Sequence, residues 1–240
     1  MPKLGKRTIA AREQVDADQL YDPSAAVALV KGNATAKFDE TVELHIKTGL
    51  DGRHADQQIR GSVVLPNGVG RDVRVLVFAE GEAATLATEA GADEVGGDDL
   101  IEKVAGGYLG FDVALAQREM MGKVGGLGRV LGPRGLMPNP RNSTVLPGED
   151  LARGVQEAKA GRVDFRLDRT NLLHCTIGKA SFTEDQLAGN LQAMIAEIVR
   201  ARPNGAKGTL FKGATLTSTM GPGVHMDVNQ VLALAGTQTD

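Results

Sequence analysis

Apolar side chains alternate with polar ones over residues 41–47, which places Val42, Leu44 and Ile46 on one side of an extended chain. This period of two predicts a half-buried strand whose other side is polar and available to water or to a ligand. The run GSVVLP at 61–66 predicts a second strand. We expect these two strands to pair, which would leave one face of their sheet open.

From residue 73 onward the pattern changes to short, nearly continuous apolar runs that alternate with helix-like segments. A continuous run such as VRVLVFA is typical of a parallel strand that is buried on both faces. The alternation predicts a Rossmann-like α/β unit. Strands are predicted at 73–79, 93–96 and 108–114, and helices at 82–92, 98–105, 115–124 and 149–160.

The chain beyond this unit returns to strands separated by turn residues. VDFRL at 163–167 and LLHCTIG at 172–178 flank the polar residues 168–171, which predicts a hairpin. A last strand is predicted near 209–218, followed by a glycine-rich turn at 219–223 and a short polar tail.

Helices in the flanking segments are marked by side-chain caps. Asp22 precedes a proline and predicts a helix over 23–31, whereas a polar helix with a thin apolar stripe is expected within 3–16. Thr183 with Gln186 forms a capping box, the best-specified helix start in the chain. The apolar stripe of that last helix consists of Leu187, Leu191, Met194, Ile195 and Ile198.

These changes of pattern predict an α/β protein of two domains. A middle α/β domain, bounded by the changes of pattern near 67–70 and at Arg162, is inserted into an outer, discontinuous domain. Glycines at the two crossings between the domains favour a hinge there.

Residues 126–140, GLGRVLGPRGLMPNP, contain four glycines and three prolines and predict an irregular loop of fixed shape. Five basic residues and one acid lie within 113–143, whereas 82–102 holds seven acids and no base. A phosphate cradle and a solvated surface loop both fit this composition. A P-loop and a dinucleotide fingerprint do not, because Gln117 and Leu131 occupy positions that those motifs require to be small.

Composition limits the possible functions. Aromatic residues make up 3% of the 240 residues and tryptophan is absent, which argues against an aromatic platform for single strands. The net charge of −3 argues against RNA binding through bulk charge, so RNA would have to be held by a local patch or by hydrogen bonds to 2′-hydroxyls.

The sequence gives little support for a metal site, an internal disulfide or a membrane-spanning segment. The four histidines show no metal-ligand spacing, and the single cysteine, Cys175, cannot form an internal disulfide. His174 is its neighbour, but adjacent strand residues point to opposite faces. We expect no metal and no cofactor, a cytoplasmic location, and no membrane segment because no run of 18 apolar residues occurs.

Five segments in order along nearly the whole chain resemble the ribosomal L1 protein family of the bacterial large subunit. They are KFDETVEL at 37–44, DQQIRGSVVLP at 56–66, GRVLGPRGLMPNP at 128–140, GKASF at 178–182 and TSTMGP at 217–222. The resemblance implies the same inserted-domain fold. Residues 1–68 and 161–240 would form an outer, discontinuous domain of the two-layer α+β type, and residues 69–160 an inserted Rossmann-like α/β domain. It also implies a non-catalytic protein that binds large-subunit ribosomal RNA in the ribosome. It further implies a mobile stalk near the exit site, help in releasing deacylated tRNA, and repression of its own operon mRNA.

The resemblance also implies where RNA binds. It places the surface at Phe38, Glu40, Thr41 and Glu43 and at the turn after the last strand. Threonine hydroxyls suit phosphate and 2′-OH, and Phe38 or Met220 can lie flat on a ribose or base. Basic residues of the same domain are candidate phosphate contacts, and the hairpin tip is a weaker candidate. The complete set is Lys37, Phe38, Glu40, Thr41, Glu43, Arg166, Asp168, Arg169, Lys179, Thr217, Thr219, Met220 and Gly221.

Two other classes remain open from the residues alone. An α/β enzyme could bind a phosphorylated small molecule at the glycine-rich loop 122–135, although no general base is evident. A protein adaptor could use the acidic surface of 82–102 and would be indifferent to RNA. Within the resemblance itself, Gly213 stands where the family often has a small hydroxyl residue, so one hydrogen bond to RNA is expected to be missing.

Overall fold

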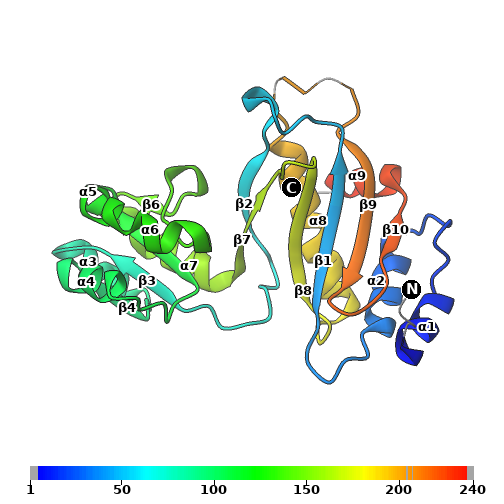
Figure 1. Cartoon of the computed structure of the whole chain (residues 1–240), viewed down its shortest axis with the longest axis horizontal. Coiled ribbons are helices and arrows are strands. Elements are labelled where there is room, and N and C mark those ends of the chain that lie inside the picture. Colours follow the sequence, from blue (N-terminus) through cyan, green and yellow to red (C-terminus); the bar gives the residue numbers. More distant parts are fainter. Residues whose placement is uncertain (1–4, 204, 207, 237–240) are drawn as a thin grey trace. The chain divides into compact units, whose positions relative to one another are not determined.

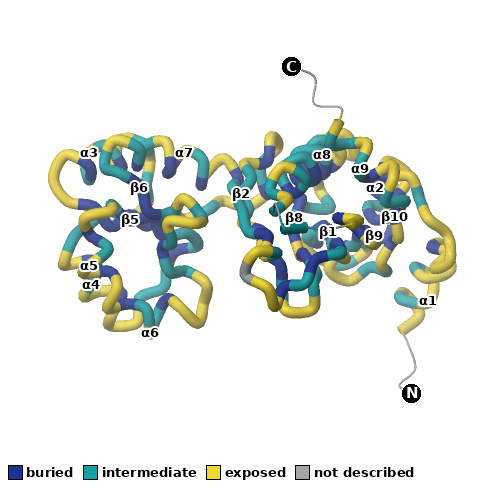
Figure 2. Tube along the Cα trace, turned by 90° about the horizontal axis from the view of Figure 1, so that it is seen from above, coloured by how far each residue is buried: buried dark blue, intermediate teal, exposed yellow. Residues whose placement is uncertain are grey.

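The computed structural model describes residues 5–203, 205–206 and 208–236. The chain divides into two compact units, an outer unit of Met1–Gly70 with Val163–Asp240 and an inserted unit of Arg71–Arg162 (Figure 1). Each unit encloses its own buried side chains along its strands and helices, while exposed residues follow the loops (Figure 2).

The outer unit is a two-layer α+β structure. Its main sheet has the strand order β10-β9-β1-β8, all antiparallel, and a separate two-stranded sheet joins β2 and β7. The elements are α1 (Lys6–Glu13), α2 (Pro23–Asn33), β1 (Thr41–Thr48), η1 (Ala55–Gln57), β2 (Arg60–Val64), β7 (Arg162–Arg166), β8 (Leu172–Lys179), α8 (Glu184–Arg200), β9 (Phe211–Ser218), β10 (Val224–Met226) and α9 (Val228–Gly236).

Two predicted strand pairings are wrong. β1 pairs with β8 and β9 and not with β2, and β7 pairs with β2 and not with β8. Phe165 of β7 explains the second choice, because its ring lies over Gly61 of β2, where an added Cβ would stand 2.6 Å from the ring. The residues at 168–171 therefore form a turn between two different sheets, with backbone bonds from Asp168 N to Leu172 O at 2.9 Å and from Asn171 N to Asp168 O at 3.3 Å.

Helices α2, α8 and α9 pack on the apolar side of the main sheet. The alternation in β1 is confirmed, since Val42, Leu44 and Ile46 are fully buried. The capping box of α8 is present, with Gln186 N donating to Thr183 Oγ1 at 3.2 Å and Thr183 N donating to Gln186 Oε1 at 2.9 Å. All five residues of its predicted stripe are buried. The sheet thus has one covered and one open face.

The C-terminal region holds more structure than the expected polar tail. β10 and α9 follow the turn at 219–223, and Val231 of α9 is fully buried. Tyr21 bridges Met226 in parallel, which ties β10 to the chain just before α2. A strand of three residues lies below the length at which alternation is readable, which is why the sequence did not indicate it.

The inserted unit is a parallel α/β sheet of order β4-β3-β5-β6 with helices on its faces. β3 is buried along its whole length, as its apolar run predicted. The elements are β3 (Val75–Phe78), α3 (Glu82–Glu89), β4 (Glu94–Gly96), α4 (Asp98–Ala105), β5 (Val113–Gln117), η2 (Arg118–Met120), α5 (Met121–Val124), η3 (Gly125–Leu127), α6 (Gly128–Leu131), η4 (Gly132–Arg134), η5 (Pro140–Asn142), β6 (Val145–Leu146), η6 (Gly148–Asp150) and α7 (Leu151–Gly161).

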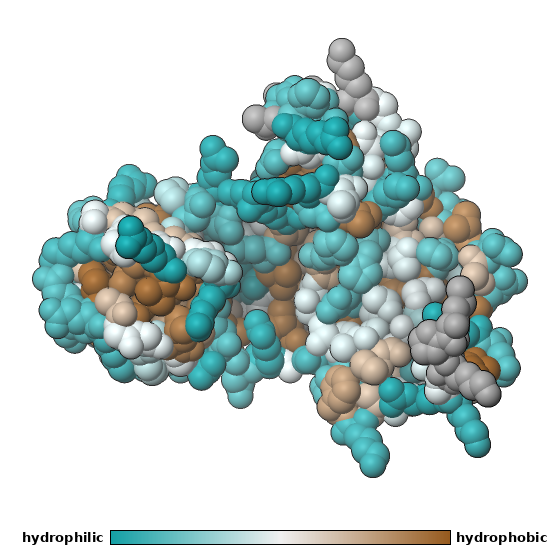
Figure 3. Space-filling model, viewed as in Figure 1, coloured by the Kyte–Doolittle hydropathy of each residue, from teal (hydrophilic) through white to brown (hydrophobic). Residues whose placement is uncertain are grey.

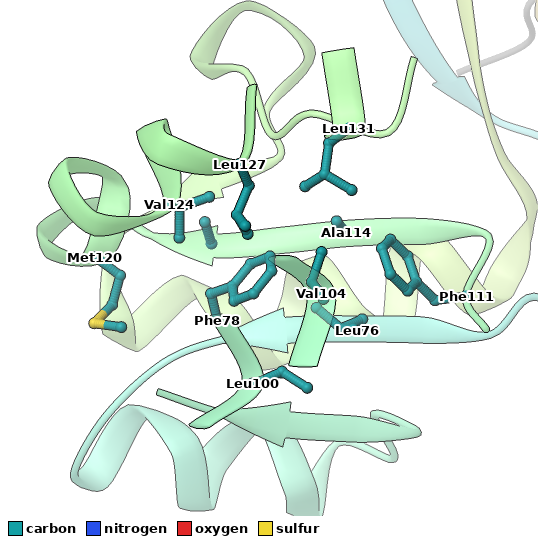
Figure 4. Close-up of a cluster of buried hydrophobic side chains, with 11 residues drawn as sticks. Leu76, Phe78, Leu100, Val104, Phe111, Ala114, Met120, Val124, Leu127 and Leu131 are labelled. Atoms are coloured by element: carbon teal, nitrogen blue, oxygen red, sulfur yellow. The ribbon is translucent and has the colours of Figure 1, made fainter. Parts of the chain in front are cut away.

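The expectation of an irregular loop over 126–140 is partly wrong. The segment from η2 to η4 follows a right-handed helical course, because Met120, Val124, Leu127 and Leu131 recur at helical spacing and enter one apolar cluster (Figure 4). The strand predicted at 108–114 is also displaced, since β5 begins at Val113. The residues before it form a loop from which Phe111 packs into the same cluster.

Candidate nucleic-acid interface

Predicted RNA-binding residues from three strands meet at one end of the open sheet. The register places Thr41 of β1 opposite Lys179 of β8, and Val42 opposite Ser218 of β9. The turn that follows β9 therefore lies beside the segment that leads into β1. We call this region, residues 37–43 with 217–221 and Lys179, the strand-end surface.

Glu40 lies beneath the strand-end surface, not on it. Its residue is 1% exposed. Its carboxylate accepts hydrogen bonds from Ala36 N at 2.8 Å, Ser218 Oγ at 2.7 Å and Met220 N at 3.0 Å. Burial raises the pKa of Glu40, but these hydrogen bonds outweigh it, and the net pKa is lowered. Glu40 therefore holds the two segments together and is placed to position the surface.

Thr41 and Thr219 join the same two segments through backbone groups and the Thr219 hydroxyl. Thr219 N donates to Thr41 O at 3.0 Å, and Thr41 N donates to Thr219 Oγ1 at 3.0 Å. Lys179 Nζ donates to Thr41 Oγ1 at 2.8 Å, which fixes the ammonium group at the edge of the surface. The nearby Asp39 carboxylate accepts from Ser181 N at 3.0 Å and from Ser181 Oγ at 2.8 Å. These contacts shape the region before any ligand arrives.

Two large apolar side chains are exposed on this rigid base. Phe38 is 55% exposed and Met220 is 52% exposed, although most large apolar residues of the outer unit are buried. Lys37, next to Phe38, is also exposed. Exposed apolar groups beside fixed hydroxyl and ammonium groups are suited to stack on a ribose or base while the polar groups bind its backbone.

Gly221 and Thr217 complete the turn after β9. An added Cβ on Gly221 would stand 2.5 Å from Ser218 Oγ, the hydroxyl that donates to Glu40. Thr217 Oγ1 lies 3.0 Å from Ser218 O and 3.3 Å from Pro222 O. Thr217 is thus committed to its own turn, and Gly221 is required by close packing.

The open face of the sheet continues from the strand-end surface into a row of polar residues. Glu43 lies opposite Thr217 and Thr176, and His45 lies opposite His174 and Thr215. The His45 and His174 Nδ1 atoms are 2.8 Å apart. Burial and the neighbouring His174 lower the pKa of His45, against a smaller opposite effect of Glu43. These effects favour the neutral form of the His45 imidazole.

Arg166, Asp168 and Arg169 belong to a second region. They lie at the other end of β8 from Lys179, a strand of eight residues that spans about 23 Å. Asp168 is engaged locally, since its carboxylate accepts from Thr170 N at 2.8 Å and Leu172 N at 2.7 Å. The candidate residues therefore form two clusters joined by the open face, and not one.

Other chemistry is limited. Burial raises the pKa of the Cys175 thiol to about 12, so this thiol stays protonated at neutral pH. The described residues contain no group of three or more side chains arranged to hold a metal ion. In the same part of the chain no helix is long and apolar enough to cross a membrane.

Sequence reasoning missed Ser218 and the histidine row. Ser218 is 2% exposed and reads as one of several hydroxyls in TSTMGP, so nothing in the sequence separates it from its neighbours. His45 and His174 are 129 residues apart and meet only through the strand pairing. The alternation of apolar and polar residues in β1 and β8 places each histidine on the polar face of its strand. This alternation was the only feature of the sequence that pointed to the pair.

The chain is similar to ribosomal proteins over most of its length. The model of the "Ribosomal protein L1p/L10e family" matches residues 30–222. The chain is 55% identical to "Large ribosomal subunit protein uL1" of Chloroflexus aurantiacus over 95% of this chain and 96% of the relative. It is 55% identical to the protein of the same name from Thermomicrobium roseum, over 95% of each chain. The corresponding protein of Dehalococcoides mccartyi is 52% identical over 98% of this chain and 100% of the relative. The chain belongs to the ribosomal protein L1p/L10e family.

Proposed function

We propose that this protein binds large-subunit ribosomal RNA through the strand-end surface of its outer unit. The observation that carries the proposal is the pair Phe38 and Met220, both exposed on a base that Glu40 fixes from below. The two exposed side chains come from segments more than 170 residues apart, and the buried carboxylate of Glu40 holds these segments together. The interface is local, which is compatible with a net charge of −3.

The family is one of ribosomal proteins and not of enzymes, so the alternative of an α/β enzyme at 122–135 is dropped. Its supposed phosphate cradle is a helical segment, and Lys123 there is paired with Glu80 at 3.1 Å and Asp98 at 2.8 Å. The adaptor alternative loses support for a similar reason. Acids of 82–102 are engaged by bases of the same unit, as in Lys103 with Glu94 at 2.8 Å.

We extend the proposal to the roles that the resemblance implies. The protein is a component of the large subunit in the cytoplasm, takes part in a mobile stalk near the exit site and assists the release of deacylated tRNA. A similar structure in its operon mRNA would occupy the same strand-end surface, so that free protein represses its own translation. A competition experiment tests this last part. Ribosomal RNA must displace an operon leader transcript from the protein, and the same substitutions must weaken the binding of both RNAs.

Equilibrium binding to a fragment of large-subunit ribosomal RNA tests the main proposal. Met220→Ala and Thr219→Ala should each weaken binding by about 1–3 kcal/mol, since each removes one apolar or hydroxyl contact from the surface. Leu20→Ala is the matched control, because Leu20 is also an exposed apolar residue of the outer unit, at 64% exposure, and its neighbour Tyr21 bridges Met226 of β10 outside the strand-end surface. Equal affinity of all three variants and the wild type would refute the assignment of this surface.

A further inference from the structure

Two histidines of the open face meet where β1 pairs with β8, outside the strand-end surface. The register places His45 directly opposite His174, and their Nδ1 atoms are 2.8 Å apart. The ring centroids are 4.9 Å apart and the ring planes cross at 66°, so the rings turn their Nδ1 edges toward each other and are not stacked. The surface over β8, β1 and β9 is mainly hydrophilic (Figure 3). We call His45 and His174 the histidine pair.

The backbone that carries the histidine pair is held in place by the sheet and by the core. β1 is hydrogen-bonded to β8 on one side and to β9 on the other. The neighbours of both histidines along their strands are buried, namely Leu44, Ile46, Leu173 and Cys175. Both rings nevertheless reach water, since the side chain of His45 is 29% exposed and that of His174 is 51% exposed. The pair is therefore preformed and accessible to a dissolved ligand.

A carboxylate lies near the outer nitrogen of each ring. Glu43 Oε2 is 3.7 Å from His45 Nε2, and Asp168 Oδ2 is 3.7 Å from His174 Nε2. A negative charge at this distance favours the tautomer that carries its proton on Nε2, which leaves the lone pair on Nδ1. A carboxylate behind the ring and a free nitrogen in front of it are the usual surroundings of a histidine that binds a metal ion.

The two Nδ1 atoms do not suit each other without a cation between them. A direct hydrogen bond needs a proton on one Nδ1, and in a neutral ring this turns the lone pair of Nε2 toward Glu43 or Asp168. With both protons on Nε2, two lone pairs face each other at 2.8 Å. A cation that accepts both lone pairs removes the conflict. A shared proton is one such cation, and a metal ion is the other.

The distance between the nitrogens indicates which metal ion fits. At about 2.0–2.1 Å from one ion, nitrogens 2.8 Å apart subtend roughly 90° at it, whereas a tetrahedral ion would hold them about 3.3 Å apart. Ligand angles near 90° belong to square-planar and tetragonal sites of nitrogen and oxygen, the geometry of Cu²⁺ and Ni²⁺. We propose that the histidine pair binds Cu²⁺ or Ni²⁺ through both Nδ1 atoms, with water at the remaining positions.

Two side-chain ligands make this a reversible site. The described residues contain no group of three or more ligand side chains, so the pair binds more weakly than a structural or catalytic metal centre. A bound ion links β1 to β8 and favours the folded chain over the unfolded one. The site goes beyond the proposed function and does not depend on it, because metal can be titrated into the protein without RNA.

Isothermal titration of Ni²⁺ into the untagged full chain tests the site. At about pH 8, above the ordinary histidine pKa of about 6.5, few protons compete with the metal. The wild type should bind one ion per chain. His45→Gln and His174→Gln should each weaken binding at least about tenfold, because a single imidazole lacks the gain of a second, linked ligand. His54→Gln is the matched control, since its side chain is 65% exposed in the same unit.

Electron paramagnetic resonance of the Cu²⁺ form adds a readout that a structural change alone would not move. Nitrogen hyperfine splitting should show two imidazoles in the wild type and at most one in either variant of the pair. Ni²⁺ should also raise the midpoint of thermal unfolding of the wild type and of His54→Gln but not of the two pair variants. Unfolding without metal verifies that every variant is folded.

Three results would overturn the metal site. They are no binding by the wild type, equal affinity in all four proteins, and a loss of affinity in His174→Gln alone, which is what one exposed imidazole would give. None of them bears on the proposed function, because no RNA is present. Conversely, a wild type that fails to bind ribosomal RNA but binds one Ni²⁺ through both histidines would refute the proposed function and uphold the site.

Discussion

Ser218 Oγ donates to the buried carboxylate of Glu40 at 2.7 Å and links residues 178 positions apart in the chain. The same carboxylate oxygen accepts from Met220 N, so one acid fixes the last residue of β9 and the exposed methionine beyond it. The strand-end surface is accordingly formed before RNA binds, and its geometry depends on one ionised group.

Glu40→Gln should destabilise the protein by about 1–3 kcal/mol, because the amide has one acceptor oxygen for donors on both sides and leaves a buried N–H group unsatisfied. Urea unfolding at neutral pH measures this loss. Because its folded pKa lies below the ordinary value of 4.5, Glu40 contributes stability fully above pH 4.5. The difference between wild type and variant should therefore shrink as the pH falls through the lowered pKa. A difference that grows on acidification would contradict the hydrogen-bonding account.

His45 should make the protein less stable in acid. Its folded pKa is lowered below 6.5 by burial and by His174, so the unfolded chain binds the proton first. Stability should be complete above about pH 6.5 and decline below it. His45→Gln removes this part of the pH dependence, and thermal unfolding between pH 7.5 and 5 measures it. His54→Gln, a change at a well-exposed histidine, serves as the control; identical profiles for the wild type and both variants would refute the assignment.

Gly126→Ala and Gly135→Ala should have opposite effects on stability. Both positions have open space where a Cβ would stand, so steric contacts do not decide the outcome. Gly126 lies within the helical course of 118–134, where alanine stabilises by roughly 0.5–1 kcal/mol. Gly135 has a φ of 71°, and alanine there should cost about 1 kcal/mol. Chemical denaturation of the two variants checks this; a destabilised Gly126→Ala would argue against the helical course.

Asn190→Leu should be among the most damaging changes in the outer unit. Asn190 is fully buried on α8, and its amide group donates to Ile177 O at 2.7 Å and to Gly68 O at 3.0 Å. Its oxygen accepts from Asn67 N at 3.0 Å. Leucine leaves these backbone groups unsatisfied, at about 1–3 kcal/mol for each. A loss under 1 kcal/mol in urea unfolding would show that water or rearrangement replaces the network; Gln192→Leu on the same helix is a comparison at a partly exposed site.

Local signals in the sequence predicted individual elements well. The cap at Asp22, the capping box of Thr183 and Gln186, and the buried run of β3 each depend on neighbouring residues alone, and each is present. Strand pairing was predicted wrongly because it depends on contacts such as Phe165 over Gly61, whose partners are about a hundred residues apart. The helical course of 118–134 was predicted only as far as residue 124, because glycine and proline content beyond it outweighed a readable apolar spacing.

In the candidate site, too, some features could be predicted from the sequence and others depend on contacts between distant segments. Phe38 and Met220 are exposed, as a stacking role requires, and they were identified through the family resemblance. The burial of Glu40 and the separation of Arg166 and Arg169 from Thr219 could not be predicted, because they depend on how β1 pairs with β8 and β9.

Hydrogen–deuterium exchange of the full chain with and without a large-subunit ribosomal RNA fragment tests the central claim most directly. RNA should protect peptides that cover 36–47 and 211–223. Peptides across 118–134 of the inserted unit should exchange at the same rate in both states. Protection confined to 118–134, with 36–47 and 211–223 unchanged, would contradict the account.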